Sequence, residues 1–304
     1  MSRISVVVPL FDAERYIGEA IASLALQEVP PDEIVIVNDA SRDGSEDAAR
    51  DALALHAAEL RATRVVVLRR SENGGPGRAR NDGIAQVTGD LLLCMDADDR
   101  LAPRALRVLR EGMERHDLAL AVIGYASDPS GERFPDEDLR EWDLRALEPA
   151  LVELGDPLRT VAHPSFVMGR ASNVVVRRSA LGELRYCEDA RLNEGVDLWY
   201  RVVKAACAEG ARVGLFTEPL IRFRIRALSL SHAPVADWRA LEPPPTVRRY
   251  RASDDPRDRR MARTIAERWL AHARAILHAD DLRAFEREHA TIFEDLDISP
   301  KVRA

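Results

Sequence analysis

Three carboxylates, Asp96, Asp98 and Asp99, stand within four positions of one another directly after the apolar run LLLCM. Like charges this close repel one another unless a cation lies between them. Carboxylate oxygens suit Mg²⁺ or Mn²⁺, which keep coordination positions open for phosphates. The Asp-x-Asp spacing therefore predicts a divalent-metal site beside a diphosphate. The alternative is a solvated loop whose carboxylates cap the helix expected from Pro103.

Polar residues also end three earlier apolar runs. The four runs cover residues 4–10, 33–39, 64–70 and 90–96, and helix-period segments at 14–27, 45–61, 78–87 and 103–115 follow them. This alternation predicts βαβ units and a mainly parallel sheet that is buried on both faces. Ligands of such sheets bind outside the carboxyl ends of the strands, so the polar endings should converge on one crevice.

The remainder of the chain is less regular. We expect an acidic surface excursion at 127–149, a helix at 196–210, a strand at 212–218 and a helix at 259–279 that packs on the main domain. The triple proline in 241–258 favours extended geometry, which predicts a linker or a loop laid over the surface. The predicted organisation is one domain over 1–240, with a nucleotide-binding half of about 1–125 and an acceptor half of about 126–240. A linker and C-terminal helical extension would occupy 241–304.

Composition excludes several classes of protein. A net charge of -7 argues against a nucleic-acid binder, because phosphate backbones reward a basic surface. Three scattered cysteines and no secretory segment predict reduced thiols and a cytoplasmic location. We expect no transmembrane segment, because no stretch of about 18 apolar residues occurs.

Four segments, in their order and spacing, closely resemble the family 2 glycosyltransferases of GT-A fold. They are VVVPLFDAERYIGEAIASLALQE, VIVNDASRDGS, SENGGPGRARNDGIAQVTGDLLLCMDADDRLAPRAL and EGVDLWYRV. The resemblance is close over residues 4 to about 125 and loose over 172 to about 232. It implies an α/β GT-A nucleotide-diphospho-sugar transferase fold and a metal-dependent, inverting transfer of sugar.

The resemblance also implies the nucleotide site. Pro9, Phe11 and Glu14 match positions that line the nucleotide pocket. Asp39 matches a carboxylate that reads the edge of the base, where it can accept an N–H. The loop NGGPGRARN, which begins at Asn73, matches a segment close to the nucleotide. Within that loop, Arg78 or Arg80 could pair with phosphate.

The metal ligands implied by the resemblance are Asp96 and Asp98, which occupy the D-x-D positions. Asp98 is the expected direct ligand of Mn²⁺ or Mg²⁺, and Asp96 lies nearer the ribose. Asp99 would touch the sugar or the water shell of the metal. His232, in RFRIRALSLSH, matches a position where some members supply a metal ligand; the alternative is a surface histidine.

The catalytic base is the point at which this sequence departs from the family. Inverting transfer needs a carboxylate that takes the proton of the acceptor hydroxyl. The family places this base in an acidic Glu-Asp pair, and here Glu194 is followed by Gly195. Glu194 and Asp197, which share one helix face, are the candidate bases. Glu188 and Asp189 are a third option.

The sequence therefore predicts a glycosyltransferase that moves a sugar from a nucleoside diphosphate sugar, with a UDP-sugar slightly favoured, to a hydroxyl-bearing acceptor. A homodimer and a peripheral membrane contact are compatible with it. The rival hypothesis, which Gly195 motivates, is a nucleotide-sugar-binding protein of similar fold with little or no turnover.

Overall fold

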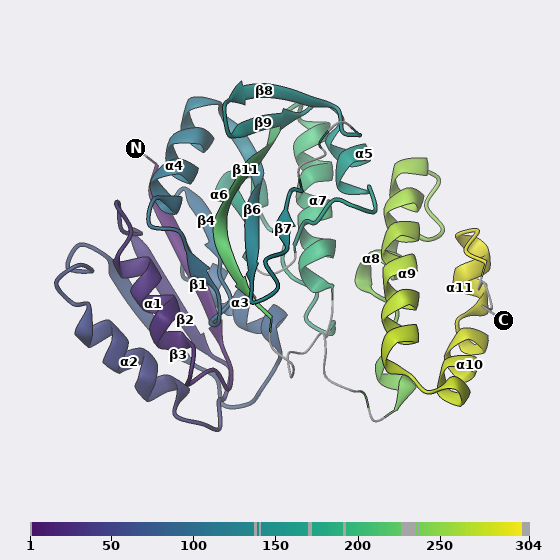
Figure 1. Cartoon of the computed structure of the whole chain (residues 1–304), viewed down its shortest axis with the longest axis horizontal. Helices are drawn as coiled ribbons and strands as arrows, with labels where there is room; N and C mark the ends of the chain where they lie inside the picture. The colour runs from purple at the N-terminus through teal and green to yellow at the C-terminus, as the bar shows by residue number, and fades with distance from the viewer. Residues whose placement is uncertain are drawn as a thin grey trace.

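A computed structural model describes residues 2–136, 139, 141–169, 172–190, 193–225, 235 and 237–299. One sheet forms the centre of the molecule, in the strand order β3-β2-β1-β4-β10-β6-β11-β9-β8, with β5 paired to β11 and β7 to β6 (Figure 1). The strands are β1 (Ile4–Leu10), β2 (Glu33–Asn38), β3 (Arg64–Arg69), β4 (Leu91–Cys94), β5 (Arg100–Leu101), β6 (Leu118–Asp128), β7 (Arg133–Phe134), β8 (Leu144–Glu148), β9 (Leu151–Leu154), β10 (Val174–Arg177) and β11 (Arg212–Arg224).

The first half of the chain forms the predicted parallel βαβ units. Strand β1 pairs in parallel with both β2 and β4, and β2 pairs in parallel with β3. The connecting helices are α1 (Ile17–Ala25), α2 (Ser45–Leu55), α3 (Pro76–Ile84) and α4 (Ala105–Arg115). Strands β1, β2 and β4 are almost completely buried, because their runs of Val, Ile and Leu face helices on both sides of the sheet. The predicted α/β class is thus confirmed.

The expectation that the strands are buried on both faces of the sheet fails at one edge. Strand β3 is not buried on both faces, because it forms the edge of the sheet; Val65 is 37% exposed there. Strand β10 lies antiparallel between β4 and β6, so the sheet is mixed beyond β4. The acidic segment 127–149 is more regular than expected, since it contains the end of β6, the short β7 and the edge strand β8.

The second half of the chain adds helices to this sheet. They are α5 (Pro157–Val161), α6 (Arg178–Leu181), α7 (Glu194–Ala208), the 3-10 turn η1 (Trp238–Ala240), α8 (Pro245–Tyr250), α9 (Pro256–Ile276), α10 (Ala279–Glu288) and α11 (Ala290–Asp295). Figure 1 shows α8 to α11 gathered on the side of the sheet that carries α7. In the described part of the chain, no helix has both the length and the apolar character needed to cross a membrane.

The C-terminal helices differ from the sequence expectation in one respect. The triple proline does not lead into an extended linker, because α8 begins at the third proline, whose fixed backbone angle suits the first turn of a helix. Helix α9 buries Met261, Ile265, Trp269 and Ala273, which share one face of the helix, while Ile276 on the same stripe is only half-buried.

Candidate functional site

The predicted carboxylates lie at one edge of the sheet. Asp39 follows the carboxyl end of β2, and the Asp96–Asp99 segment follows the carboxyl end of β4. Strand β1 lies between these two strands and runs parallel to both, so all three ends open on the same side. This is the edge at which open α/β sheets bind their ligands.

Asp39 organises the glycine-rich loop that follows β3. Its two side-chain oxygens accept the main-chain N–H groups of Gly74, at 2.9 Å, and Gly75, at 2.8 Å. Arg70 Nε lies 2.8 Å from the same carboxylate, and Asn73 Nδ2 donates to the Asp39 carbonyl. Gly75 has a φ of 86°, which strongly favours glycine. The loop and the buried carboxylate thus fix each other at the crevice.

The end of β1 supplies an apolar surface beside Asp39, whose main-chain N–H donates to the Leu10 carbonyl at 2.8 Å. Pro9 is half-buried in β1, and Phe11, directly after the strand, is 37% exposed. The Arg42 guanidinium lies 5.4 Å from the centre of the Phe11 ring. Glu14 accepts the N–H of Gly44 at 3.2 Å, which joins the start of α1 to the start of α2. An exposed ring at a strand end offers a flat surface on which a nucleobase can stack.

Asp99 is the most enclosed of the three clustered carboxylates. It accepts the Ser172 hydroxyl at 2.7 Å and the main-chain N–H of Arg224 at 3.2 Å. Ser172 also accepts the main-chain N–H of Asp96, so it joins both ends of the segment. Burial, followed by the charges of Asp96 and Asp98, raises the pKa of Asp99 well above its ordinary value. The cluster is therefore under the electrostatic strain that the sequence predicted.

The donor set fits a divalent cation only in part. Asp96 and Asp98 are half-buried, offer hard oxygen atoms, and repel Asp99. Within the ranges that the structure describes, no three His, Cys, Asp or Glu side chains converge closely enough to hold a metal by themselves. A Mg²⁺ or Mn²⁺ ion at this segment would thus need further ligands, and the oxygens of a bound diphosphate are suited to that purpose.

Arg80 connects the carboxylate cluster to the second half of the site. Its Nη2 donates to Asp96 Oδ1 and its Nη1 to Glu194 Oε1, each at 2.7 Å. The guanidinium also lies over the Tyr186 ring. Burial by itself would lower the pKa of Arg80, but the charges of Asp96, Tyr186 and Glu194 raise it well above its ordinary value. The sequence indicated a cation in this loop but not that it would bridge these two acids.

The two candidate bases differ in accessibility. Glu194 is the first residue of α7, and its side chain is 12% exposed. Asp197 lies one turn further along α7, has a side chain with no exposed surface, and binds Arg201 Nε at 2.9 Å and Arg249 Nε at 3.2 Å. An acceptor could reach Glu194 more readily than Asp197.

Gly195 lies directly against a second glycine. A Cβ atom at Gly195 would lie 2.6 Å from the Gly169 carbonyl oxygen, and one at Gly169 would lie 2.7 Å from the Gly195 carbonyl carbon. Gly169 also has a φ of 75°. The main chain of the preceding loop thus occupies the space that a side chain at position 195 would need.

The remaining predicted residues lie around this centre. Arg78 is exposed, with its Nε 3.5 Å from Glu188 Oε2, while Glu188 Oε1 accepts Asn81 Nδ2. Asp189 binds the Arg248 guanidinium through both oxygens, and this arginine, together with the Cys187 thiol, lowers the pKa of Asp189 to about 2. His232 lies outside the described residues.

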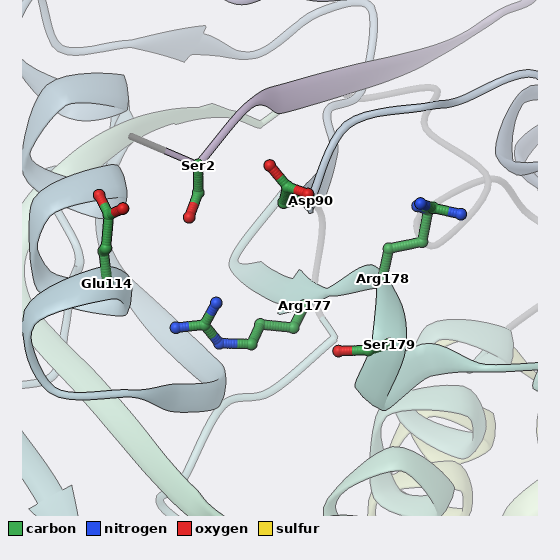
Figure 2. Close-up of a pocket in the computed structure, with 6 residues that line it drawn as sticks. All are labelled: Ser2, Asp90, Glu114, Arg177, Arg178 and Ser179. Carbon is green, nitrogen blue, oxygen red and sulfur yellow. The ribbon is translucent and has the colours of Figure 1, made fainter.

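A polar hollow of about 450 Å³ opens beside the amino-terminal ends of strands β1 and β4, opposite the carboxyl ends that carry Asp39 and Asp96. Figure 2 shows its lining residues, which are Ser2, Asp90, Glu114, Arg177, Arg178 and Ser179. Arg177 Nε and Nη2 donate to the carbonyls of Leu118 and Met113, and Arg178 Nε donates to the Gly89 carbonyl. Both arginines thus bind the main chain around the end of α4 and the start of β4, and the hollow lies away from the carboxylate cluster.

The fold and the carboxylates together define an α/β protein with an acidic cluster at the carboxyl ends of strands β2 and β4. The chain belongs to glycosyl transferase family 2, whose model matches residues 5–175. That range includes the strand-end residues from Pro9 to Asp99 and ends before α7.

Curated relatives agree with this family. The chain is 28% identical over 233 residues to the uncharacterized glycosyltransferase EpsJ of Bacillus subtilis, covering 76% of this chain and 63% of EpsJ. It is 31% identical over 227 residues to the succinoglycan biosynthesis protein ExoU of Rhizobium meliloti, covering 69% and 58%. It is 31% identical over 128 residues to the poly(ribitol-phosphate) beta-N-acetylglucosaminyltransferase TarS of Staphylococcus aureus, covering 40% and 21%. The chain thus spans less than two thirds of each of these relatives.

Solved structures share the fold. A crystal structure of Staphylococcus aureus TarS 1-349 in complex with UDP-GlcNAc aligns with a TM-score of 0.70 at 17% identity, covering 97% of this chain and 81% of that one. The mannosyltransferase PcManGT of Pyrobaculum calidifontis, in complex with GDP-Man and Mn2+, aligns with a TM-score of 0.52, covering 98% and 85%. The predicted GT-A fold is confirmed by the family match and these alignments.

Proposed function

We propose that this protein is a metal-dependent, inverting glycosyltransferase that moves a sugar from a nucleoside diphosphate sugar to a hydroxyl acceptor. The observation that carries the proposal is the Arg80 bridge, which joins Asp96 at the end of β4 to Glu194 at the start of α7. It places a carboxylate suited to the donor and one suited to the acceptor on either side of one guanidinium. Family membership supports the reaction class.

The donor side is built from β1, β2 and β4. The ring of Phe11 would stack on the base. The carboxylate of Asp39 could accept an N–H of the base after its hydrogen bond from the Gly74 N–H breaks. Asp98, with Asp96, would hold Mg²⁺ or Mn²⁺. Such an ion, when bound, neutralises the charge that develops on the departing diphosphate. A UDP-sugar is favoured, since the TarS crystal structures hold UDP and UDP-GlcNAc.

We assign the acceptor side to α7 and to Gly169, which lies between α5 and β10. We favour Glu194 over Asp197 as the general base, because Asp197 is enclosed by two arginines. Glu194 Oε1 is held by Arg80, which orients the carboxylate, and Oε2, which accepts no hydrogen bond from the described residues, would take the proton of the acceptor hydroxyl. Relatives named for poly(ribitol-phosphate) transfer and succinoglycan biosynthesis support polysaccharide or glycoconjugate biosynthesis as the setting.

The first experiment identifies the donor. Thermal-shift measurements with UDP, GDP, CDP and dTDP sugars, each with and without Mn²⁺, should show one nucleotide that stabilises the protein in the presence of metal. Calorimetry on Asp98→Asn should then show loss of the metal-dependent part of the affinity. Asp51→Asn, which changes an exposed carboxylate on α2, is the matched control. A gain in nucleotide affinity on addition of Mn²⁺ that is as large in Asp98→Asn as in the parent would refute the metal assignment.

A second candidate function is nucleotide-sugar binding with little or no turnover. The packing of Gly169 on Gly195 favours it. Position 195, where the family carries its base, has no side chain here, and the Gly169 main chain leaves no space for one. The two functions differ in one measurement, the release of nucleoside diphosphate from the donor. Turnover by the parent that collapses in Glu194→Gln supports the transferase. Tight donor binding without turnover over a broad range of acceptors supports the binding protein.

A further inference from the structure

The two glycines that meet at the acceptor side are carried by elements that the C-terminal helices hold in place. Gly169 lies between α5 and β10, and Gly195 lies in the first turn of α7. Their main chains are in contact, so a small displacement of either element would change the shape of the site beside Glu194. The residues that fix these elements therefore bear on the proposed reaction.

Helix α9 fixes the loop. Arg268 Nη2 donates to the carbonyls of both Pro164 and Phe166, each at 2.8 Å. One turn earlier, the Thr264 hydroxyl donates to the Ala162 carbonyl, also at 2.8 Å, and this contact is buried. Three main-chain carbonyls within five residues of the loop thus bind side chains of one helix.

The segment that contains α8 and the start of α9 fixes α7. Arg249, on α8, binds the fully buried Asp197 one turn into α7. Asp258, in the first turn of α9, accepts the Tyr200 hydroxyl at 3.0 Å and pairs with Lys204 Nζ at 2.5 Å. Contacts thus recur along successive turns of α7, on the helix that carries Glu194.

We propose that residues 245–268 position the acceptor side of the site, with Arg249 and Arg268 as positioning residues for transfer. This inference rests on the proposed glycosyltransferase function. Both arginines bind groups that carry or adjoin the Gly169–Gly195 contact, whereas the donor groups Asp39 and Asp98 follow strands of the nucleotide-binding half. Loss of Arg268 should therefore slow turnover without weakening nucleotide binding.

The test uses the full chain with Arg268→Met. Three quantities are measured: the affinity for UDP with Mn²⁺ by calorimetry, the rate of UDP-GlcNAc hydrolysis, in which water replaces the acceptor hydroxyl, and hydrogen exchange of residues 162–169. We expect unchanged UDP affinity, faster exchange of the loop, and a hydrolysis rate lower by about tenfold, since a displacement of about 1 Å near a reacting centre can cost more than this. Arg268→Lys, which keeps the charge, should restore part of the rate.

The matched control is Arg263→Met on the same helix, because Arg263 pairs with Glu267 at the surface. It should resemble the parent in all three measurements. A hydrolysis rate and loop exchange equal to the parent's in Arg268→Met would overturn the proposal, as would a fall in UDP affinity as large as the fall in rate. Should Arg268→Met fail to fold, Thr264→Val removes one of the three carbonyl contacts and is held to the same outcomes.

Hydrogen exchange separates this inference from the function on which it rests. A parent that binds UDP but hydrolyses no nucleotide sugar would refute the proposed transferase. Loop exchange would then decide the positioning role by itself: faster exchange in Arg268→Met supports it, and unchanged exchange overturns it.

Discussion

Gly195→Ala should destabilise the protein, although alanine is the better helix former. Gly195 is the second residue of α7, where the exchange for alanine would gain up to about 1 kcal/mol of helix propensity in open space. Here the added Cβ would lie 2.6 Å from the Gly169 carbonyl oxygen, well inside the 3.4 Å at which ordinary van der Waals contact begins. Overpacking against main chain costs about 1–3 kcal/mol, so we expect a net loss of about 1–2 kcal/mol in the free energy of unfolding.

Gly18→Ala is the matched control for this measurement. Gly18 is the second residue of α1, and no atom lies within 4 Å of a Cβ built there. It should stabilise the protein by about 0.5–1 kcal/mol, so the two variants should differ by about 2 kcal/mol. Urea unfolding followed by circular dichroism gives both values from the shift of the midpoint at constant slope. The steric reasoning is refuted if Gly195→Ala is as stable as Gly18→Ala.

Two further predictions concern buried charge. Burial opposes the ionised form of Glu33, but hydrogen bonds from Ser5, Thr88 and Gly89 lower its pKa from 4.5 to about 2. The ionised Glu33 should therefore add about 3 kcal/mol to the free energy of unfolding. This contribution should be complete above pH 4.5 and lost as the pH falls toward 2. The same pH dependence of unfolding in Glu33→Gln and in the parent would contradict this prediction. Arg80→Met leaves Asp96 and Glu194 without their shared cation, so it should lower the free energy of unfolding by about 3 kcal/mol. The stability of Arg80→Lys should lie between those of Arg80→Met and the parent. Unaltered urea midpoints would show that the bridge adds no stability.

Local patterns were sufficient to predict the parallel βαβ units of the first half of the chain. Continuous apolar runs alternating with helix-period segments predicted the βαβ order, and parallel strands bring their carboxyl ends to one edge whatever their spacing along the chain. Asp39 and Asp96 were therefore predicted to lie at the same edge of the sheet, and the structure places both at the carboxyl ends of the strands that flank β1. The repulsion within the Asp96–Asp99 segment was also a local property, since it depends on residues adjacent in sequence.

Patterns failed where the partner is remote in sequence or where strand order decides burial. The run at 64–70 has the composition of a buried strand, yet β3 is half-exposed because nothing pairs beyond it among the described strands. The proline-rich segment after 241 suggested a linker, but packing of Tyr250 against Tyr200 on α7 accompanies a short helix there. Neither outcome is encoded in the local residue order.

The sequence by itself determined the fold class, the carboxylate segment and the departure at Gly195, because each depends on neighbouring residues. Only the tertiary structure decided what these groups do to one another. Arg80 bridges acids that lie 16 and 114 positions away, and Arg249 encloses Asp197 from 52 positions away. Such contacts arise because a packed core brings segments that are distant in sequence within a few ångströms of each other. The same packing determines which of the carboxylates stays accessible.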